Sequence, residues 1–321
     1  EIGVSYFINS KIIEEGKTTT PISTFLSIIN NLQTERLNLE KRDNGLVIKT
    51  DNYEAVVHGL PHKDFPIIPT VQNQNDNIKV KSDFLKEALS QVVLAAQFSD
   101  LRPELNSVLV DFSLDIIKLA ATDSFRLSEK TIGSGKFESN HNKPFKLLIP
   151  LKTSQELLRV LKDGETVTIY HDNHQILFKT EHWEFISRLI EGTFPDYTSI
   201  IPKKFNSEAV LVREELINAL KLAGVFGSRV SEVNIKVLGS KKAIEVSSTD
   251  QTLGENKYTL SAKVQGEVVE ASFNWHYLLD GLKALKSDDV YLGFNKENKP
   301  TIIKSPNDAS YFYILMPILK A

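Results

Sequence analysis

Internal repetition constrains the fold of this chain more than any other feature of its sequence. Pro21 opens a segment with apolar residues at helical spacing, and Phe65 follows that proline by 44 positions. Pro150 and Phe194 bracket a second segment of the same length and the same pattern. In both segments, turn residues separate short apolar runs after the helical part, as expected for strands. Two copies of one supersecondary unit are therefore predicted.

A third copy of this unit begins at Asn274 and ends in Met-Pro at residues 316–317, where the other copies end in Phe-Pro. A second type of unit lies between these copies. An apolar run at residues 78–80 with a helical pattern after it matches the run at residues 210–212 and the pattern that follows there. The chain is thus predicted to consist of two alternating types of half-unit.

Each half-unit is predicted to be a strand, a helix and three strands. Leu85, Leu89 and Val92 show the helical spacing that buries one stripe against a sheet. The expected fold class is α+β, with antiparallel sheets covered on one side by helices. Polar linkers at residues 72–77 and 203–207 predict a partial first domain at 1–72, a middle domain at 77–203 and a C-terminal domain at 207–321.

Two motifs stand out against this repeated background. Predicted strands at residues 108–112 and 116–121 flank a polar turn, and residues 122–127 then read Thr-Asp-Ser-Phe-Arg-Leu. Near the C-terminus, residues 316–319 read Met-Pro-Ile-Leu. In this order and at this separation, the motifs resemble the ATDxxRL signature and the C-terminal tail of the bacterial sliding clamp, the β subunit of the replicative DNA polymerase.

The resemblance implies a DNA-clamp fold with helices on the inner face. In that family two protomers of three domains each form a ring around duplex DNA, with no reading of base sequence. The implied partners are the polymerase, the clamp loader and repair proteins. Because the half-units would pair into domains, we expect one half-unit of about 45 residues before Glu1.

The family's peptide pocket, which accepts Gln-x-x-Leu-Phe-like motifs, is carried over to this chain residue by residue. The implied pocket residues are Arg102, Leu105, Thr122, Ser124, Phe125, Arg126, Leu127, Pro195, Ser199, Ile200, Val230, Asn274, Tyr277, Asn298, Pro300, Ile314, Leu315, Met316, Pro317 and Ile318. Family resemblance also suggests DNA-facing cations, although ordinary solvated helix faces remain an alternative. These candidates are Lys86, Arg102, Lys152, Arg159, Lys221 and Lys283.

Ring closure between two protomers would use an outer strand and the end of a helix. The implied interface residues are Tyr53, Glu54, Ala55, Val56, Val57, His58, Val225 and Phe226. A place for Phe226 in the core of its own domain is the alternative. The intact protein is expected to be a homodimer.

Composition excludes several other classes of protein. The chain has 321 residues, a net charge of −3 and no cysteine, so disulfides, thiolate metal sites and cysteine nucleophiles are excluded. A globally basic nucleic-acid binder is disfavoured, although a locally positive surface is compatible with this charge. No apolar run reaches the length of a membrane span and no signal peptide opens the chain, which favours the cytoplasm.

Three other local patterns are typical of different functions or of turns. Residues 133–136, Gly-Ser-Gly-Lys, lack the remaining residues of a phosphate loop and predict a hairpin turn. His171, His174 and His182 would suit a metal hydrolase, but solvated turns explain them better. Asp123 and Asp250 occupy equivalent positions in the repeat, which predicts a shared turn-forming role.

No pairing of a nucleophile with a base is recognisable, so we expect a protein that is not an enzyme and has no cofactor or metal. Two alternatives remain: an interaction module that binds peptides without sliding on DNA, and a histidine-based metal hydrolase.

Overall fold

The computed structural model describes residues 2–33, 36–99, 101–227, 231–296 and 298–319. Its contacts divide the chain into two units, one of residues 6–70 and a larger one of residues 1–5 and 71–321. The sequence predicted a single piece from residue 1 to 72. The difference at the N-terminus arises because strand β1 (Ile2–Tyr6) pairs with β13 (Trp183–Arg188) in a sheet of the larger unit.

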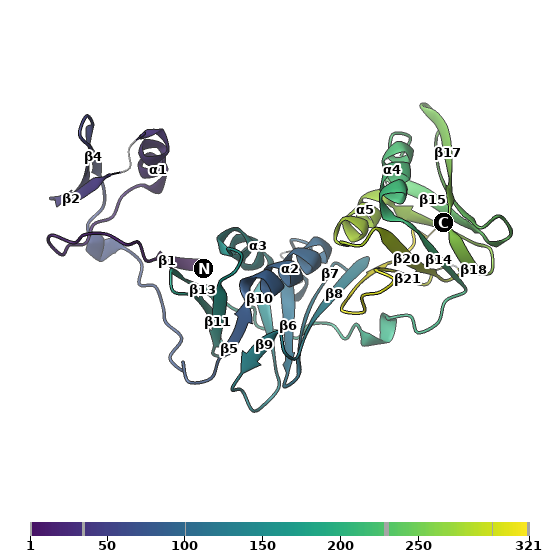
Figure 1. The fold of residues 1–321 in the computed structure, drawn as a ribbon, viewed down its shortest axis with the longest axis horizontal. Coiled ribbons are helices and arrows are strands. Elements are labelled where there is room, and N and C mark those ends of the chain that lie inside the picture. The colour runs from purple at the N-terminus through teal and green to yellow at the C-terminus, as the bar shows by residue number, and fades with distance from the viewer. Residues whose placement is uncertain (1, 34–35, 100, 228–230, 297, 320–321) are drawn as a thin grey trace. The chain divides into compact units, whose positions relative to one another are not determined.

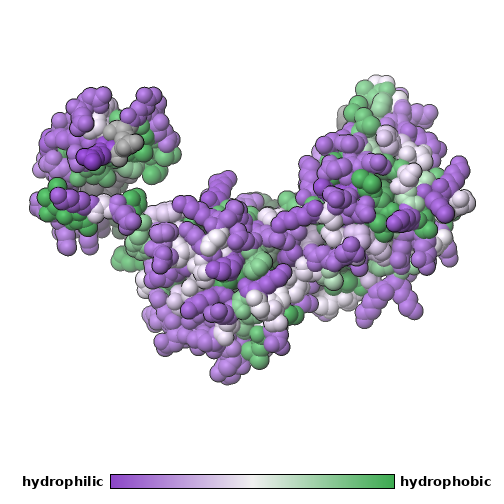
Figure 2. Space-filling model, in the orientation of Figure 1, coloured by the Kyte–Doolittle hydropathy of each residue, from purple (hydrophilic) through white to green (hydrophobic). Residues whose placement is uncertain are grey.

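The smaller unit is one helix packed on a three-stranded sheet. Helix α1 (Ile22–Asn31) begins after Pro21, a residue whose fixed φ suits a helix start. The sheet has the order β2 (Asn38–Arg42), β3 (Gly45–Lys49), β4 (Glu54–His58). Leu46, Ile48 and Val57 of the sheet pack against Phe25, Ile28 and Leu32. Figure 2 shows apolar surface on this unit, and Ile22 is 71% exposed.

The larger unit contains four half-units of the predicted kind (Figure 1). The first is β5 (Ile78–Lys81), α2 (Ser82–Val92), β6 (Ser107–Ser113), β7 (Ile116–Thr122) and β8 (Arg126–Gly133), with a short β9 (Phe137–Ser139) after it. The second is β10 (Phe145–Pro150), α3 (Leu151–Val160), β11 (Thr166–His171), β12 (Gln175–Lys179) and β13. The third is β14 (Ser207–Val212), α4 (Arg213–Gly224), β15 (Glu232–Leu238), β16 (Ala243–Asp250) and β17 (Gly254–Ser261), followed by β18 (Lys263–Gly266). The fourth is β19 (Val269–Asn274), α5 (Trp275–Lys283), β20 (Asp289–Phe294), β21 (Thr301–Lys304) and β22 (Tyr311–Leu315).

These strands form three sheets in the larger unit, and every pairing with a described register is antiparallel, as predicted. One sheet has the order β1-β13-β12-β11-β5-β9, and another has β17-β16-β15-β19. The longest sheet, β10-β6-β7-β8-β22-β21-β20-β14-β18, joins strands from all four half-units. It does so because β8 pairs with β22, with Leu127 opposite Ile314.

Helix faces with the predicted apolar spacing supply the core of the larger unit. Leu85, Leu89 and Val92 of α2 are 5%, 1% and 0% exposed. They belong to a continuous hydrophobic cluster with the strands beneath them. Burial of such stripes is the main favourable contribution to folding. None of the described helices combines the length and the apolar character that spanning a lipid bilayer requires.

The predicted turns form by the expected chemistry. Oδ1 of Asp123 accepts hydrogen bonds from the backbone N–H groups of Phe125 and Arg126 at 2.9 and 3.0 Å. Asp250 accepts the equivalent pair from Thr252 and Leu253 at 2.8 and 2.9 Å. The shared turn-forming role of the two aspartates is therefore confirmed. The Gly-Ser-Gly-Lys segment is a turn between β8 and β9, but the predicted hairpin is wrong, because β9 pairs with β5 in another sheet and not with β8.

Candidate peptide-binding site

The corner at residues 122–127 is shaped by its own polar side chains. Thr122 Oγ1 donates to the carbonyl of Arg126 at 2.7 Å and accepts from the N–H of Ser124 at 3.2 Å. Ser124 has a φ of 77°, a left-handed backbone conformation that residues other than glycine rarely adopt. Asp123, which is 4% exposed, holds the next two N–H groups. The result places Phe125 on the surface, 61% exposed.

Arg126 connects this corner to helix α5. Its Nε donates to Asp123 Oδ2 at 2.9 Å, and its Nη1 donates to Asp280 Oδ2 at 2.5 Å. The guanidinium also lies 4.0 Å from the centre of the Tyr277 ring, a cation–π arrangement. Since the side chain is only 11% exposed, these contacts compensate for the burial of its charge.

The C-terminal tail lies against the corner. Beyond the last strand pair, Leu315 opposite Arg126, the N–H of Met316 donates to the carbonyl of Phe125 at 2.8 Å. The N–H of Ile318 then donates to the carbonyl of Ser272 at 2.7 Å. Two segments almost 190 residues apart in the sequence (316 minus 127 is 189) are thus brought together.

An apolar cluster forms the base of this junction. Leu127 and Ile314 are 0% and 1% exposed and pack in one cluster with Phe194 and Tyr197. The hydroxyl of Tyr197 donates to Glu129 at 2.6 Å and fixes the segment that leads to η4 (Thr198–Ile200). Of the candidates in that segment, Pro195 is half-buried, Ser199 is exposed and Ile200 is 44% exposed.

The remaining candidates have other positions. Arg102 Nη1 donates to Ser124 Oγ at 3.4 Å and so reaches the corner, while Leu105 is 5% exposed. The side chain of Asn274 caps α5 by accepting from the N–H groups of His276 and Tyr277. Exposed Asn298, with a φ of 63°, and half-buried Pro300 have no described contact with the corner. Val230 lies outside the described residues.

The candidate DNA-facing cations fall into two groups. Lys86 pairs with Asp163 at 2.7 Å, Arg102 with Glu104 at 3.1 Å and Arg159 with Glu156 at 2.9 Å. The other three are exposed and have no ion-pair partner among the residues that the structure describes. They are Lys152, Lys221 and Lys283, on α3, α4 and α5.

The candidate ring-closing residues lie at a sheet edge and a helix end. Strand β4, which carries residues 54–58, is an edge of the three-stranded sheet, and Tyr53 precedes it. Val225 follows α4 directly and is 64% exposed. Phe226 is half-buried, and its ring lies near Gly254 at the start of β17.

The histidines differ in part from the prediction. His174 and His182 are exposed in turns, as expected, although Nδ1 of His174 lies 3.6 Å from a Glu191 oxygen. His171 is not a solvated turn residue. Its ring stacks on His141 with a centroid distance of 5.2 Å and contacts Phe145 at 4.1 Å. Burial lowers the pKa of His171. Within the described part of the chain, no three histidine or acidic side chains form a group able to bind a metal.

Several residues of the junction were missed by the sequence. Asp280, Tyr197 and Ser272 are not among the site residues predicted from the sequence. The spacing of Phe194, Tyr197 and Ile201 is an apolar signal that could have indicated the cluster. The contact between Arg126 and Asp280 joins residues 154 positions apart and leaves no local pattern.

Alternating half-units in continuous antiparallel sheets, with a corner that meets the C-terminal tail, define a clamp-type protein. A solved sliding clamp from Bacillus subtilis matches with a TM-score of 0.92 and 26% identity, covering 100% of this chain and 86% of that one. The β subunit from Thermotoga maritima matches with a TM-score of 0.92 and 25% identity, covering the same shares.

Sequence comparisons agree with the structural ones. Family models of the DNA polymerase III β subunit match residues 79–196 (central domain) and 198–319 (C-terminal domain). The β sliding clamp of Bacillus subtilis is 28% identical over 312 residues, which is 96% of this chain and 81% of that protein. A Staphylococcus aureus β sliding clamp is 29% identical over 310 residues, with the same shares covered. The chain belongs to the family of DNA polymerase III β subunits, the sliding clamps that act as processivity factors.

Proposed function

We propose that this chain works as a non-catalytic scaffold that encircles duplex DNA and tethers other proteins to it. The tether would be a short peptide, of the Gln-x-x-Leu-Phe kind, bound where the corner meets the tail. The observation that carries this proposal is the hydrogen bond from Met316 N–H to the Phe125 carbonyl, because it assembles one site from both motifs. The partners would be the replicative polymerase, the clamp loader and repair polymerases, in the cytoplasm.

The chemistry of the junction suits an apolar peptide with few polar groups. Phe125 and Ile200 offer exposed apolar surface, while Met316 and Pro317 are half-buried beside the corner. Methionine adapts its shape to different partners, which suits a site that several proteins use in turn. An extended peptide that loses its freedom on binding has modest affinity, so exchange between partners would be fast.

The DNA-binding part of the proposal rests on Lys152, Lys221 and Lys283. Each lies on a different helix and has its ammonium free to approach a phosphate, within the described residues. Contacts of this kind carry no sequence information, which a sliding protein requires. Lys86, Arg102 and Arg159 would contribute less, because each is already paired with a carboxylate.

We further propose that residues 77–203 and 207–321 are two complete domains of the clamp and that residues 1–72 belong to a third. Family matches at 79–196 and 198–319 support the first two. In a homodimeric ring, edge strand β4 of one protomer would meet the region of Val225 and Phe226 of the other. A free strand edge supports this, since its unpaired backbone groups can pair with another chain.

A second candidate is a module that binds peptides but does not slide on DNA. The pairing of three of the six candidate cations with carboxylates favours it, because paired cations attract phosphates less. Measurable DNA affinity with a steep dependence on salt would exclude this candidate.

A peptide titration tests the proposal. Fluorescence anisotropy of a labelled Gln-Leu-Ser-Leu-Phe peptide would be followed as the chain is added, and we expect saturable binding. The Met316→Ala variant should bind at least about fivefold more weakly, since the residues whose truncation costs more than about 1 kcal/mol cluster at the centre of an interface. Leu253→Ala, at an exposed apolar residue 63% accessible and outside the candidate site, is the matched control. Absence of binding to the folded wild-type chain would contradict the proposal.

A further inference from the structure

Strand β8 presents a row of polar side chains on one face. Arg126, Ser128 and Lys130 alternate along the strand, so all three point to the same side of the sheet. Ser128 and Lys130 are 0% and 6% exposed, and Arg126 has a side chain 11% exposed. Buried polar groups on a strand need partners, and each member of the row finds them on other elements. We call these three residues the β8 polar row.

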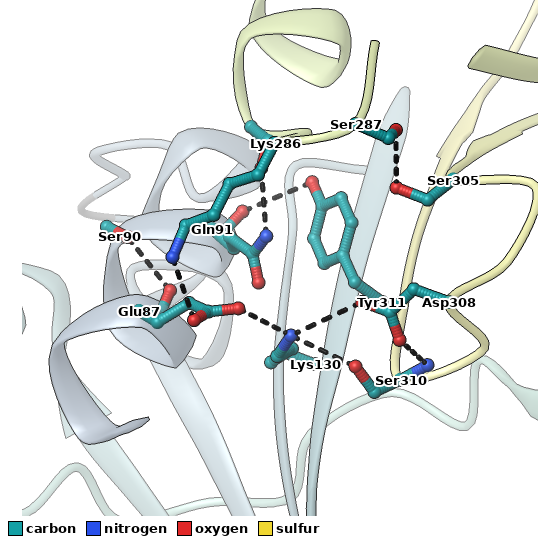
Figure 3. A network of polar contacts seen from close by, with 11 residues as sticks. Glu87, Ser90, Gln91, Lys130, Lys286, Ser287, Ser305, Asp308, Ser310 and Tyr311 are labelled. Atoms are coloured by element: carbon teal, nitrogen blue, oxygen red, sulfur yellow. Dashed lines mark hydrogen bonds and ion pairs between the residues drawn. The ribbon is translucent and has the colours of Figure 1, made fainter. Parts of the chain in front are cut away.

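The Lys130 end of the row connects α2 to the C-terminal part of the chain (Figure 3). The Lys130 ammonium lies 2.8 Å from Glu87 Oε1 on α2 and 3.0 Å from Ser310 Oγ. The other oxygen of Glu87 accepts from Lys286, just after α5, at 2.9 Å. Burial raises the pKa of Glu87, but the hydrogen bonds from the two lysines outweigh that effect and lower it. Glu87 therefore bridges two lysines as a carboxylate.

The centre of the row ties the same two helices by hydrogen bonds. Ser128 Oγ donates to the carbonyl of Gln91 on α2 at 2.9 Å. The side-chain amide of Gln91 donates in turn to the carbonyl of Ala284, at the end of α5, at 2.8 Å. Tyr311 of β22 contacts both Ser128 Oγ, at 3.2 Å, and the Gln91 carbonyl, at 3.4 Å. Figure 3 shows the side chains of Gln91 and Tyr311 next to each other.

The Arg126 end of the row reaches the candidate peptide site. Arg126 binds Asp280 of α5, and the residue before it accepts the hydrogen bond from Met316. Each end of the row is thus linked to α5 or to the loop after it, while Ser128 and Lys130 are linked to α2. Backbone pairing of β8 with β22 fixes their register, but the twist between neighbouring strands varies over tens of degrees.

We propose that the β8 polar row, together with Glu87 and Asp280, is a latch that fixes the orientation of the middle domain relative to the C-terminal domain. This latch rests on the proposed function, because its effect is on the peptide site. Arg126 is then a positioning residue: it acts on the peptide site through Asp280 and Tyr277, and the peptide does not contact its guanidinium. The latch holds α2 and α5 together on one face of the sheet. Without it, the pairing of β8 with β22 would not by itself fix the twist angle between these two strands. Loss of either end would widen the range of twist between the two domains and so loosen the geometry of the peptide site, while the backbone pairing of β8 with β22 remains.

The absence of cysteine from the chain makes a direct test possible. Cysteines introduced at the exposed residues Lys162 and Asn218 would carry two spin labels, one in each domain, for distance measurement by double electron–electron resonance. We expect a narrow distance distribution in the parent protein. Glu87→Gln and Asp280→Asn, which keep the side-chain shape and remove the charge, should broaden it.

A control variant separates the latch from a general loss of ion pairs. Glu184→Gln breaks a pair with Lys179 of similar length, 2.7 Å, that lies within the middle domain, and it should leave the distribution unchanged. Lys286→Met removes one arm of the latch at a side chain 75% exposed, so this variant is expected to fold and to broaden the distribution less.

Peptide titrations on the same proteins complete the test. Glu87→Gln and Asp280→Asn should weaken peptide binding about fivefold, as expected for residues coupled through one network. The effects of Arg126→Lys and Asp280→Asn should not add, because both break the same contact. An unchanged distance distribution in both charge-removing variants would overturn the latch. If the variants broaden the distribution while the parent protein fails to bind peptide, the latch stands and the proposed function fails.

Discussion

At the scale of single residues, Asp123 shows how one side chain can specify a local shape. Its two oxygens accept two backbone N–H groups and the Nε of Arg126. The turn-forming role was predictable, because aspartate commonly binds the backbone two or three residues further on. The ion pair was not, because the buried position of Asp123 and the direction of Arg126 depend on strands far along the chain.

Asp123→Ala should reduce the free energy of unfolding by about 1–3 kcal/mol, because two backbone donors and a nearly buried guanidinium lose their partner. Asp250→Ala is a natural control, since Asp250 forms the same turn without an arginine. It should destabilise the protein less. Chemical denaturation followed by circular dichroism measures both. Equal losses in the two variants would show that the contact with Arg126 does not contribute.

At the scale of elements, the helices and long strands were predictable and the pairing between distant strands was not. The apolar spacing of residues 85–92 indicates α2 because both the helix period and the buried face appear within one segment. Strand β9 has only three residues, too few for a recognisable pattern. The pairing of β8 with β22 depends on contacts nearly 190 residues apart, so no local signal could indicate it.

The lowered pKa of His171, at the end of β11, predicts that the stability of the protein depends on pH. Burial lowers the pKa of His171 and of His141, which stacks on it, while Asp172 and Asp76 oppose the shift for His171. A histidine with a lowered pKa in the folded state binds protons more weakly than in the unfolded chain. Its contribution to stability is complete above the usual pKa of 6.5 and is lost as the pH falls through the folded-state value.

We therefore expect the free energy of unfolding to decrease as the pH falls below about 6.5, with a smaller decrease in His171→Phe. The aromatic replacement keeps the packing on Phe145, beside a small apolar cavity of about 30 Å³ that His171 also lines. His182→Gln, at an exposed histidine, should follow the parent protein. Urea titrations between pH 5 and pH 8 measure the three curves, and identical slopes in all three would contradict this account of His171.

At the scale of the whole molecule, the repeat in the sequence predicted the order of the half-units. The structure shows which of the candidate DNA-facing cations are paired with carboxylates and which are not. The sequence placed six cations on or near predicted helices but did not indicate which of them are free to contact a DNA phosphate. The partner of Lys86 is Asp163, which lies far from it in the sequence, so no local pattern indicates that pair. The pairs of Arg102 with Glu104 and of Arg159 with Glu156 are local. Positions of the corner and tail motifs were predictable from the resemblance. Their direct hydrogen bond required the three-dimensional structure.

Removal of the three unpaired lysines should weaken DNA binding in a way that depends on salt. For the triple variant Lys152→Ala, Lys221→Ala and Lys283→Ala, the slope of log K against log salt concentration should be shallower by roughly 1 per lysine that contacts a phosphate. The double variant Lys86→Ala and Arg159→Ala removes cations already paired and should change the slope less. Anisotropy of a labelled duplex at several salt concentrations measures the slopes. A larger change in the double variant would contradict this assignment.

The central claim is that partner peptides bind where the corner meets the tail, and site-specific crosslinking tests it most directly. A Gln-Leu-Ser-Leu-Phe peptide with a photoreactive group on its phenylalanine would be irradiated with the chain, and the crosslinked residues identified by mass spectrometry. The account predicts crosslinks to both motifs, at residues 122–127 and 314–318. Crosslinks confined to other surfaces, or none at saturating peptide with the chain folded, would contradict it.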